Sequence, residues 1–110
     1  GVAHEFTVVS GHLPPGHPGS LVDWAALGRL RGTVCVLMGL KHLALIAAAL
    51  VDGGRPADTP VAVVQEGTTG EQRTVRATLG SVAATVTAAG VRPPAVVVIG
   101  PVVDALPQLP

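Results

Sequence analysis

The sequence predicts an α/β fold with a mixed five-stranded sheet and helices on both faces. Apolar, valine-rich stretches of strand length alternate along the chain with stretches of helix-forming residues, which is the pattern of an α/β layer. The runs at residues 60–64 and 95–99 are continuously apolar, so we expect them to be covered on both sides. Only a short polar turn separates the third strand from the fourth, which favours antiparallel pairing there and therefore a mixed sheet.

Five strands are expected. The run at residues 60–64 should be central in the sheet because it is apolar throughout, whereas residues 72–77 alternate roughly as a half-exposed edge strand does. Pro93 and Pro94 fix an extended approach to the last strand. The five expected strands are residues 6–9, 33–38, 60–64, 72–77 and 95–99.

Three helices are expected between these strands. The first is amphipathic and has a polar start at Ser20 or Asp23. The second stops at Gly53, which is followed by Gly54, and the third is capped by Thr78 and stops at Gly90. Their expected ranges are residues 21–30, residue 43 to the glycine pair, and residue 78 to about 88.

The composition predicts one folded domain. The chain has 110 residues, of which 48% are hydrophobic and 13% charged, and seven basic residues balance seven acidic ones. A chain of this size buries roughly two-thirds of its unfolded surface, enough for a core without disulfides or metal. We therefore expect a single domain over residues 1–110, with a disordered tail at about 104–110.

The same composition argues against several classes of partner. Zero net charge and 2% aromatic residues remove the electrostatic and stacking terms on which nucleic-acid binding depends. The one apolar window long enough to span a membrane, residues 33–51, has Lys41 and His42 at its centre, so a membrane is not expected. A single cysteine, Cys35, suggests a reducing compartment. Because no signal-peptide pattern opens the chain, we expect a cytoplasmic protein.

Three loops are candidate ligand sites because ligands of open α/β sheets bind beyond the carboxyl ends of the strands. They are residues 10–19, 38–40 and 66–69. Gly39 follows Met38 at the end of a strand, where the absence of a Cβ would let a flat ligand lie against the main chain. A glycine needed only for the turn explains Gly39 equally well. The same two interpretations stay open for the turn that contains Gly67 and Thr68.

The remaining candidates favour structural interpretations. Cys35 lies mid-strand among valines, where a thiol is inert. The four histidines are scattered without the spacing of metal ligands, so no metal site is expected. Glu66, Arg73 and Arg76 could bind an acidic substrate, but charges around an edge strand usually form a solvated face. No phosphate-binding loop and no pair of catalytic carboxylates is present in the sequence.

Four strings of residues, in order and spacing, carry a resemblance to a known family. They are residues 6–12 (FTVVSGH), 36–40 (VLMGL), 60–68 (PVAVVQEGT) followed by Gln72 and Arg73, and 95–100 (AVVVIG). Together they resemble the C-terminal domain of the uroporphyrinogen-III C-methyltransferases, members of the tetrapyrrole methylase family. The resemblance covers residues 3 to about 103.

The resemblance implies a two-domain enzyme that binds S-adenosyl-L-methionine in the cleft between unlike α/β domains. The methyl acceptor would be uroporphyrinogen III, methylated twice to precorrin-2 for sirohaem and cobalamin synthesis. The family's cofactor contacts would fall here on Met38, Gly39, Gly67 and Thr68. Its catalytic residues belong to the N-terminal domain, so the resemblance implies no catalytic residue in this chain and an inactive isolated domain. The expected partners are that N-terminal domain and a second copy in a homodimer.

Two other interpretations compete with this one. The chain could belong to another tetrapyrrole methylase that acts on a later precorrin, although the turn at Glu66 and Gly67 followed by Gln72 and Arg73 favours the first interpretation. Alternatively, it could be a dimerisation module whose loops bind no ligand. Cofactor that copurifies with the full-length protein, or its absence, would separate a methylase domain from such a dimerisation module.

Overall fold

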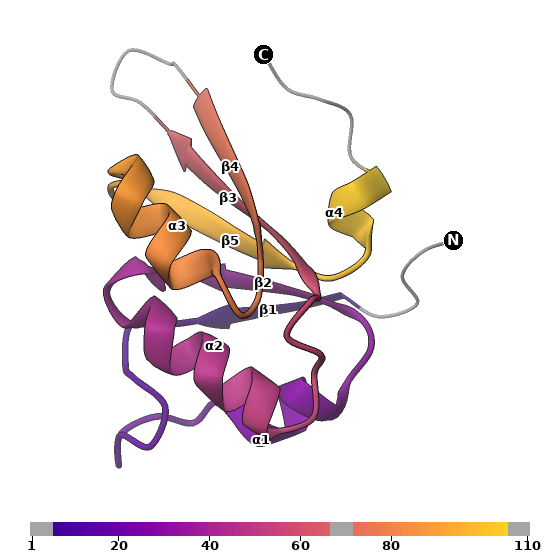
Figure 1. Ribbon diagram of the computed structural model, residues 1–110. Coiled ribbons are helices and arrows are strands. Elements are labelled where there is room, and N and C mark those ends of the chain that lie inside the picture. The colour runs from indigo at the N-terminus through magenta and orange to yellow at the C-terminus, as the bar shows by residue number, and fades with distance from the viewer. Residues whose placement is uncertain (1–5, 67–71, 106–110) are drawn as a thin grey trace.

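The computed structural model describes residues 6–66 and 72–105 (Figure 1). Its regular elements alternate between strands and helices as the sequence predicts. In chain order they are β1 (Phe6–Ser10), α1 (Trp24–Arg29), β2 (Thr33–Leu37), the 3₁₀ turn η1 (Leu40–His42), α2 (Leu43–Asp52), β3 (Pro60–Glu66), β4 (Gln72–Thr78), α3 (Val82–Ala89), β5 (Ala95–Ile99) and α4 (Val102–Ala105).

The five strands form one mixed sheet in the order β1-β2-β5-β3-β4. The β1 and β2 strands are parallel, while β5 is antiparallel to both of its neighbours, β2 and β3. The β3 and β4 strands form an antiparallel pair. The predicted mixed sheet is therefore confirmed, with β4 at an edge and β3 inside the sheet. The strand in the middle is β5, the last in sequence.

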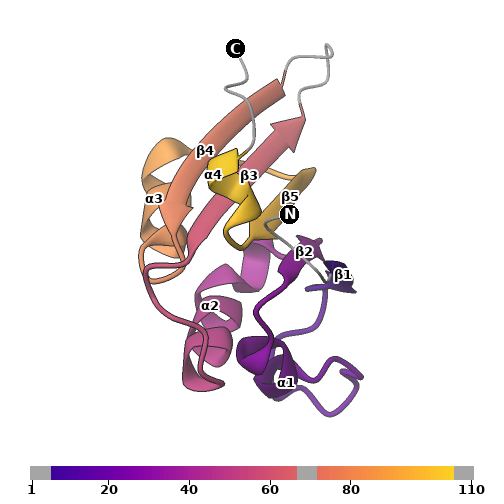
Figure 2. The same cartoon turned by 90° about the vertical axis from the view of Figure 1, so that its right-hand side faces the viewer.

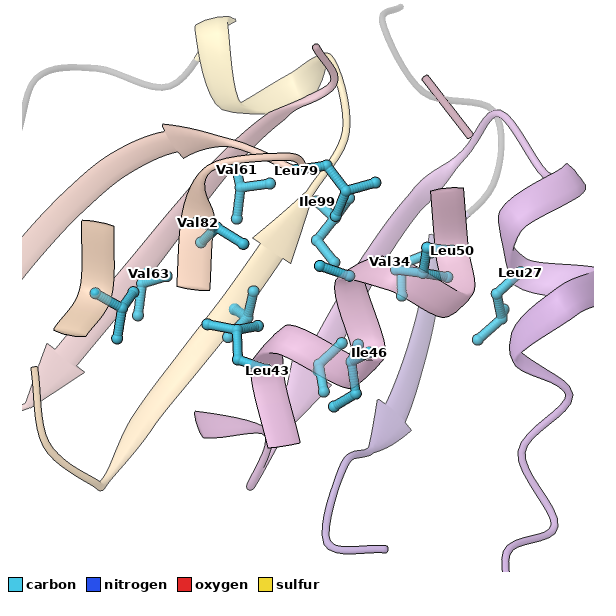
Figure 3. Close-up of a cluster of buried hydrophobic side chains, with 14 of the residues drawn as sticks. Leu27, Val34, Leu43, Ile46, Leu50, Val61, Val63, Leu79, Val82 and Ile99 are labelled. Carbon is cyan, nitrogen blue, oxygen red and sulfur yellow. The ribbon is translucent and has the colours of Figure 1, made fainter. Parts of the chain in front are cut away.

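One face of the sheet carries the hydrophobic core. Side chains alternate across a strand, and on this face every core residue of β2, β3 and β5 is 0% exposed. Leu43, Ile46 and Leu50 of α2 pack on this face together with Leu79 and Val82 (Figure 3). The spacing of the α2 residues is the helical spacing that the sequence predicts. The strand residues of this face are Val34, Val36, Val61, Val63, Val97 and Ile99.

Within residues 6–66 and 72–105, the helix on the opposite face of the sheet is the four-residue α4. Figures 1 and 2 show α4 on the other side of the sheet from α3. Val103 of α4 is 1% exposed, and its carbonyl oxygen accepts a hydrogen bond from Nη1 of Arg76 on β4 (2.9 Å). Helices on both faces are therefore confirmed, but the layer formed by α4 is much smaller than the layer formed by α2 and α3.

Two predicted helix starts need correction. The first helix begins at Trp24, and Oδ1 of Asp23 accepts from the backbone N–H of Ala26 (2.9 Å). Leu21, expected inside that helix, is 100% exposed. Thr78 is not a helix cap because it is still the last residue of β4, and α3 starts four residues later, at Val82. Asp23, one of the two predicted starts, caps the first helix, whereas Ser81 precedes α3 without a side-chain capping hydrogen bond.

The predicted tail also needs correction. Residues 102–105 form α4, so Asp104 and Ala105 belong to a helix. Residues 106–110 lie outside the described residues. No helix within residues 6–66 and 72–105 is long and apolar enough to cross a membrane.

A buried arginine ties α1 to the sheet. Arg55 is 4% exposed, and its guanidinium donates to the carbonyl oxygens of Gly32 (3.0 Å) and Leu27 (2.9 Å). Burial lowers the pKa of Arg55 from its ordinary value. Nearby, a Cβ built on Gly28 would lie 2.9 Å from Cα of Gly53, so α1 and the end of α2 are in backbone contact. These contacts hold the C-terminal end of α1 and the connection from α1 to β2 against the end of α2.

Candidate functional site at the carboxyl edge of the sheet

The carboxyl ends of β1, β2 and β3 lie at one edge of the sheet. Ser10 pairs with Leu37 in the parallel pair. Leu37 in turn pairs with Val96, and Gln65 pairs with Ala95, at the start of β5. The predicted loops after β1 and β2 therefore leave the sheet side by side. The third predicted loop follows Glu66, the last residue of β3, which lies at the same edge. Gly67 and Thr68 lie outside the described residues.

Met38 occupies an unusual backbone conformation at this edge. The predicted strand extends to Met38, but β2 ends at Leu37. Met38 has a φ of 55°, in the left-handed region that costs an ordinary L-residue roughly 1–2 kcal/mol. Its side chain is 63% exposed. Strained residues cluster at functional sites, and the exposed thioether offers a soft apolar contact at the loop.

Gly39 is held by close packing against the core. A Cβ built on Gly39 would lie 2.6 Å from Cγ1 of Val36, closer than real side chains approach. Gly39 also precedes η1, and its carbonyl oxygen accepts from the N–H of His42 (3.3 Å). The structure thus supplies a packing reason for this glycine. Close approach of a ligand to Gly39 stays a prediction.

A second glycine at this edge was not singled out from the sequence. The N–H of Gly11 donates to the carbonyl oxygen of Leu37 (2.7 Å). A Cβ built on Gly11 would lie 2.7 Å from Cα of Gly39 and 2.9 Å from Cδ1 of Ile46. The loops after β1 and β2 therefore touch through two glycine backbones. The signal available in the sequence was that each glycine follows a strand by one or two residues.

The connection from α3 to β5 is also tied to this edge. Oε1 of Gln65 accepts from the N–H of Arg92 (2.8 Å), and the N–H of Glu66 donates to the carbonyl oxygen of Pro94 (3.1 Å). Nη2 of Arg73 donates to the carbonyl oxygen of Ala89 at the end of α3 (2.6 Å). These contacts fix the backbone at both ends of the β3–β4 turn.

The two arginines considered for an acidic substrate both bind carbonyl oxygens of the chain. Arg73 holds the end of α3, and Arg76 reaches α4 on the other face of the sheet. The structural interpretation of these charges is therefore supported, and Arg76 does not face the carboxyl edge.

The other polar candidates also have structural surroundings. Nδ1 of His17 accepts from the N–H of Gly19 (2.9 Å) within the loop after β1. Cys35 is 8% exposed, and burial raises the pKa of its thiol, as an inert cysteine requires. Over residues 6–66 and 72–105, no three His, Cys, Asp or Glu side chains gather as a metal site would need.

Comparison with known proteins identifies the family. A family model described as Tetrapyrrole (Corrin/Porphyrin) Methylases matches residues 2–83. The chain is 39% identical over 97 residues to an S-adenosyl-L-methionine-dependent uroporphyrinogen III methyltransferase of Methanosarcina barkeri, covering 88% of this chain and 38% of that protein.

Solved structures agree with this assignment. Uroporphyrin-III C-methyl transferase from Thermus thermophilus, complexed with S-adenyl homocysteine, matches with a TM-score of 0.75 and 36% identity, over 96% of this chain and 46% of that one. A cobalt precorrin-4 methyltransferase shares the fold at a TM-score of 0.76 and 18% identity. The chain thus spans less than half the length of these relatives. It belongs to the tetrapyrrole methylase family.

Proposed function

We propose that this chain is the second domain of an S-adenosyl-L-methionine-dependent uroporphyrinogen-III C-methyltransferase and that its carboxyl edge forms one wall of the cofactor cleft. The observation that carries the proposal is the convergence of the ends of β1, β2 and β3 at one edge, with Met38 strained and exposed there. The names of the Methanosarcina and Thermus relatives support the cofactor and the substrate.

The residues at this edge suit a nucleoside cofactor. Met38 presents an exposed thioether chain that can pack against an aromatic ring, and Gly39 places main chain beside it without a Cβ. By resemblance, Gly67 and Thr68 complete the wall. The bound cofactor would supply an activated methyl group on its sulfonium. The residues of this chain would hold it in line with the tetrapyrrole carbon, a contribution of positioning.

Because this chain would form one wall of the cofactor cleft, the first domain is needed to form the other wall. A ligand pocket covers most of the surface of its ligand, and one wall leaves the other side in water. The catalytic groups are proposed to lie on the N-terminal domain, which is the first partner of this chain. We also propose that the full-length protein forms a homodimer and is located in the cytoplasm.

Another precorrin methyltransferase is the second candidate. The similarity to the cobalt precorrin-4 enzyme reflects the fold alone at 18% identity, whereas the relatives named for uroporphyrinogen III reach 39% and 36%. The identities therefore favour uroporphyrinogen III as the substrate. A dimerisation module without ligand would predict no cofactor binding by the full-length protein.

The proposal is tested by titrating S-adenosyl-L-methionine in a calorimeter into both the 110-residue chain and the full-length protein. The 110-residue chain should show no dissociation constant below roughly 100 micromolar, and the full-length protein should bind at least tenfold more tightly. The isolated chain should also transfer no methyl group. Submicromolar binding by the isolated chain would contradict the one-wall arrangement.

Met38→Gly in the full-length protein tests the site itself. Glycine keeps the left-handed backbone while removing the thioether chain, so cofactor affinity should fall at least tenfold, about 1.4 kcal/mol. Thr87→Ala is the matched control because Thr87 is exposed on α3 and its hydroxyl bonds only within that helix. If both variants bind as the parent protein does, Met38 does not line the cofactor site.

A further inference from the structure

Met38 carries the exposed sulfur atom of this chain. The sequence contains one methionine and one cysteine, and these are the two side chains that peroxides oxidise stepwise. Cys35 is 8% exposed, and burial raises the pKa of its thiol, so little of the reactive thiolate forms near neutral pH. Met38 is 63% exposed at the carboxyl edge. An oxidant in solution therefore reaches the thioether of Met38 far more readily than the thiol of Cys35.

The backbone on both sides of Met38 keeps this thioether at the surface. The carbonyl oxygen of Leu37 accepts from the N–H of Gly11 (2.7 Å). A Cβ built on Gly39 would lie 2.6 Å from Cγ1 of Val36, so the chain that follows Met38 already touches the core. Met38 itself has a φ of 55° and does not belong to the core cluster. Its neighbours thus hold its side chain outside the core.

Oxidation of this side chain would act locally. Methionine sulfoxide is polar and chiral, and it disrupts a fold when the thioether lies in a core. Met38 lies outside the core, so water can solvate its sulfoxide while the sheet and the helices keep their packing. What is lost is the soft apolar surface that packs against an aromatic ring. The effect of oxidation therefore falls on ligand binding and not on stability.

An empty cofactor cleft leaves the same side chain within reach of a peroxide. In the proposed function, the carboxyl edge is one wall of a cleft that admits S-adenosyl-L-methionine, and hydrogen peroxide is far smaller than that cofactor. A bound cofactor would cover the wall, because ligand sites enclose most of the surface of their ligand. The oxidant and the cofactor therefore compete for Met38.

We propose that Met38 is a site of reversible oxidation by peroxides and that its sulfoxide form binds S-adenosyl-L-methionine weakly. The inference rests on the proposed function, in which Met38 lines the cofactor cleft. An electron pair of the sulfur attacks one oxygen of hydrogen peroxide, so that an S–O bond forms and the O–O bond breaks. The other oxygen leaves as water with both protons. The sulfur is oxidised and the peroxide reduced. Methionine sulfoxide reductases, with a thiol as reductant, return the thioether and release the oxygen as water.

The test treats the full-length protein and its Met38→Leu variant with the same hydrogen peroxide solution. Leucine keeps an apolar side chain without sulfur, so this variant reports any effect of oxidation elsewhere in the protein. Mass spectrometry of the peptide that contains residue 38 detects the added oxygen atom. Calorimetric titration with S-adenosyl-L-methionine, before and after peroxide, measures the affinity of each protein. Urea unfolding of the 110-residue chain, which has its own core, measures whether oxidation changes stability.

The proposal expects oxygen on the residue-38 peptide, an unchanged urea midpoint, and an affinity of the parent protein that falls at least tenfold, about 1.4 kcal/mol. The affinity of Met38→Leu should not change from its own untreated value. Methionine sulfoxide reductase with dithiothreitol should restore the parent affinity, and saturating cofactor should slow the oxidation of Met38 at least tenfold. Met38→Gln, which places a polar side chain there without peroxide, should reproduce the loss and serves as the second variant if Met38→Leu does not fold.

Two results would overturn the proposal alone. The first is an oxidised parent protein that binds the cofactor as tightly as the untreated protein does. The second is an equal loss of affinity in the peroxide-treated Met38→Leu variant. Failure of the untreated full-length protein to bind the cofactor is a different outcome, because it rejects the proposed function and this inference with it.

Discussion

On the face of the sheet covered by α2 and α3, Val34 of β2 is 0% exposed, whereas Val8 on the other face of the neighbouring strand is 55% exposed. The two valines differ in what lies above them, because α2 and α3 lie over the first face, whereas in the described part of the chain the helix on the other face is the short α4. Valine alone therefore does not tell which side of a strand is buried. The contrast teaches that the helix-covered face carries the buried core of this chain, while the side of β1 that carries Phe6 and Val8 contributes little to it.

The test with the largest expected effect replaces one valine by alanine on each face of the sheet. Val34→Ala should lower the free energy of unfolding by about 2 kcal/mol, because it removes buried methyl groups and leaves a cavity. Val8→Ala should change it by less than about 0.5 kcal/mol. Urea unfolding of the 110-residue chain measures both values. Similar losses for the two variants would mean that the faces do not differ in packing.

Phe6→Ser has a smaller effect on stability and tests exposure directly. Phe6 is 66% exposed on the edge strand, so we expect unfolding in urea to shift by less than about 1 kcal/mol. Binding of a hydrophobic dye to the folded chain should fall, because the largest exposed apolar side chain of β1 is lost. Leu45→Ser is the control, since Leu45 is 56% exposed on α2. Equal loss of dye binding in both variants would place the dye site elsewhere.

The smallest expected effect concerns Cys35, a buried residue of β2 that is 8% exposed. Burial raises the pKa of its thiol above the ordinary value of 9.0. The folded chain therefore holds this proton more tightly than the unfolded chain, and the resulting stability is lost as the pH rises through the folded pKa. Between about pH 8 and pH 10, the parent chain should lose more stability than Cys35→Ala. Identical pH profiles from urea unfolding would show that Cys35 is effectively solvated.

The strands could be predicted from the sequence because β-branched residues dominate them and polar or glycine-rich turns separate them. The valines of β2, β3 and β5 and the glycine stop after α2 are examples. The start of α1 was less certain because Leu21 fits the helical spacing yet lies outside the helix. The helix α4 was missed because four residues are too few to show a period.

The location of the candidate site was predictable, but not all of its parts. Met38 and Gly39 follow an apolar strand, and that is enough to place them at the carboxyl edge. The contact between Gly11 and Gly39 was not predictable, because it depends on the parallel register of β1 and β2. Nor does the sequence reveal the left-handed φ of Met38, since methionine rarely adopts it. The assignment of Gly67 and Thr68 to the cofactor site stays a prediction.

The place of β5 in the sheet has a consequence for biosynthesis. The strand is the last of the five to leave the ribosome, yet it lies between β2 and β3 and is the sole strand that joins them. Until Ile99 has emerged, the nascent chain can form only the β1–β2 pair and the β3–β4 hairpin, with the edges of β2 and β3 unpaired. Such edges invite aggregation. A chain truncated before Ala95 would therefore keep two separate pieces of sheet, held together by the packing of α2 against α3 and no longer by strand pairing.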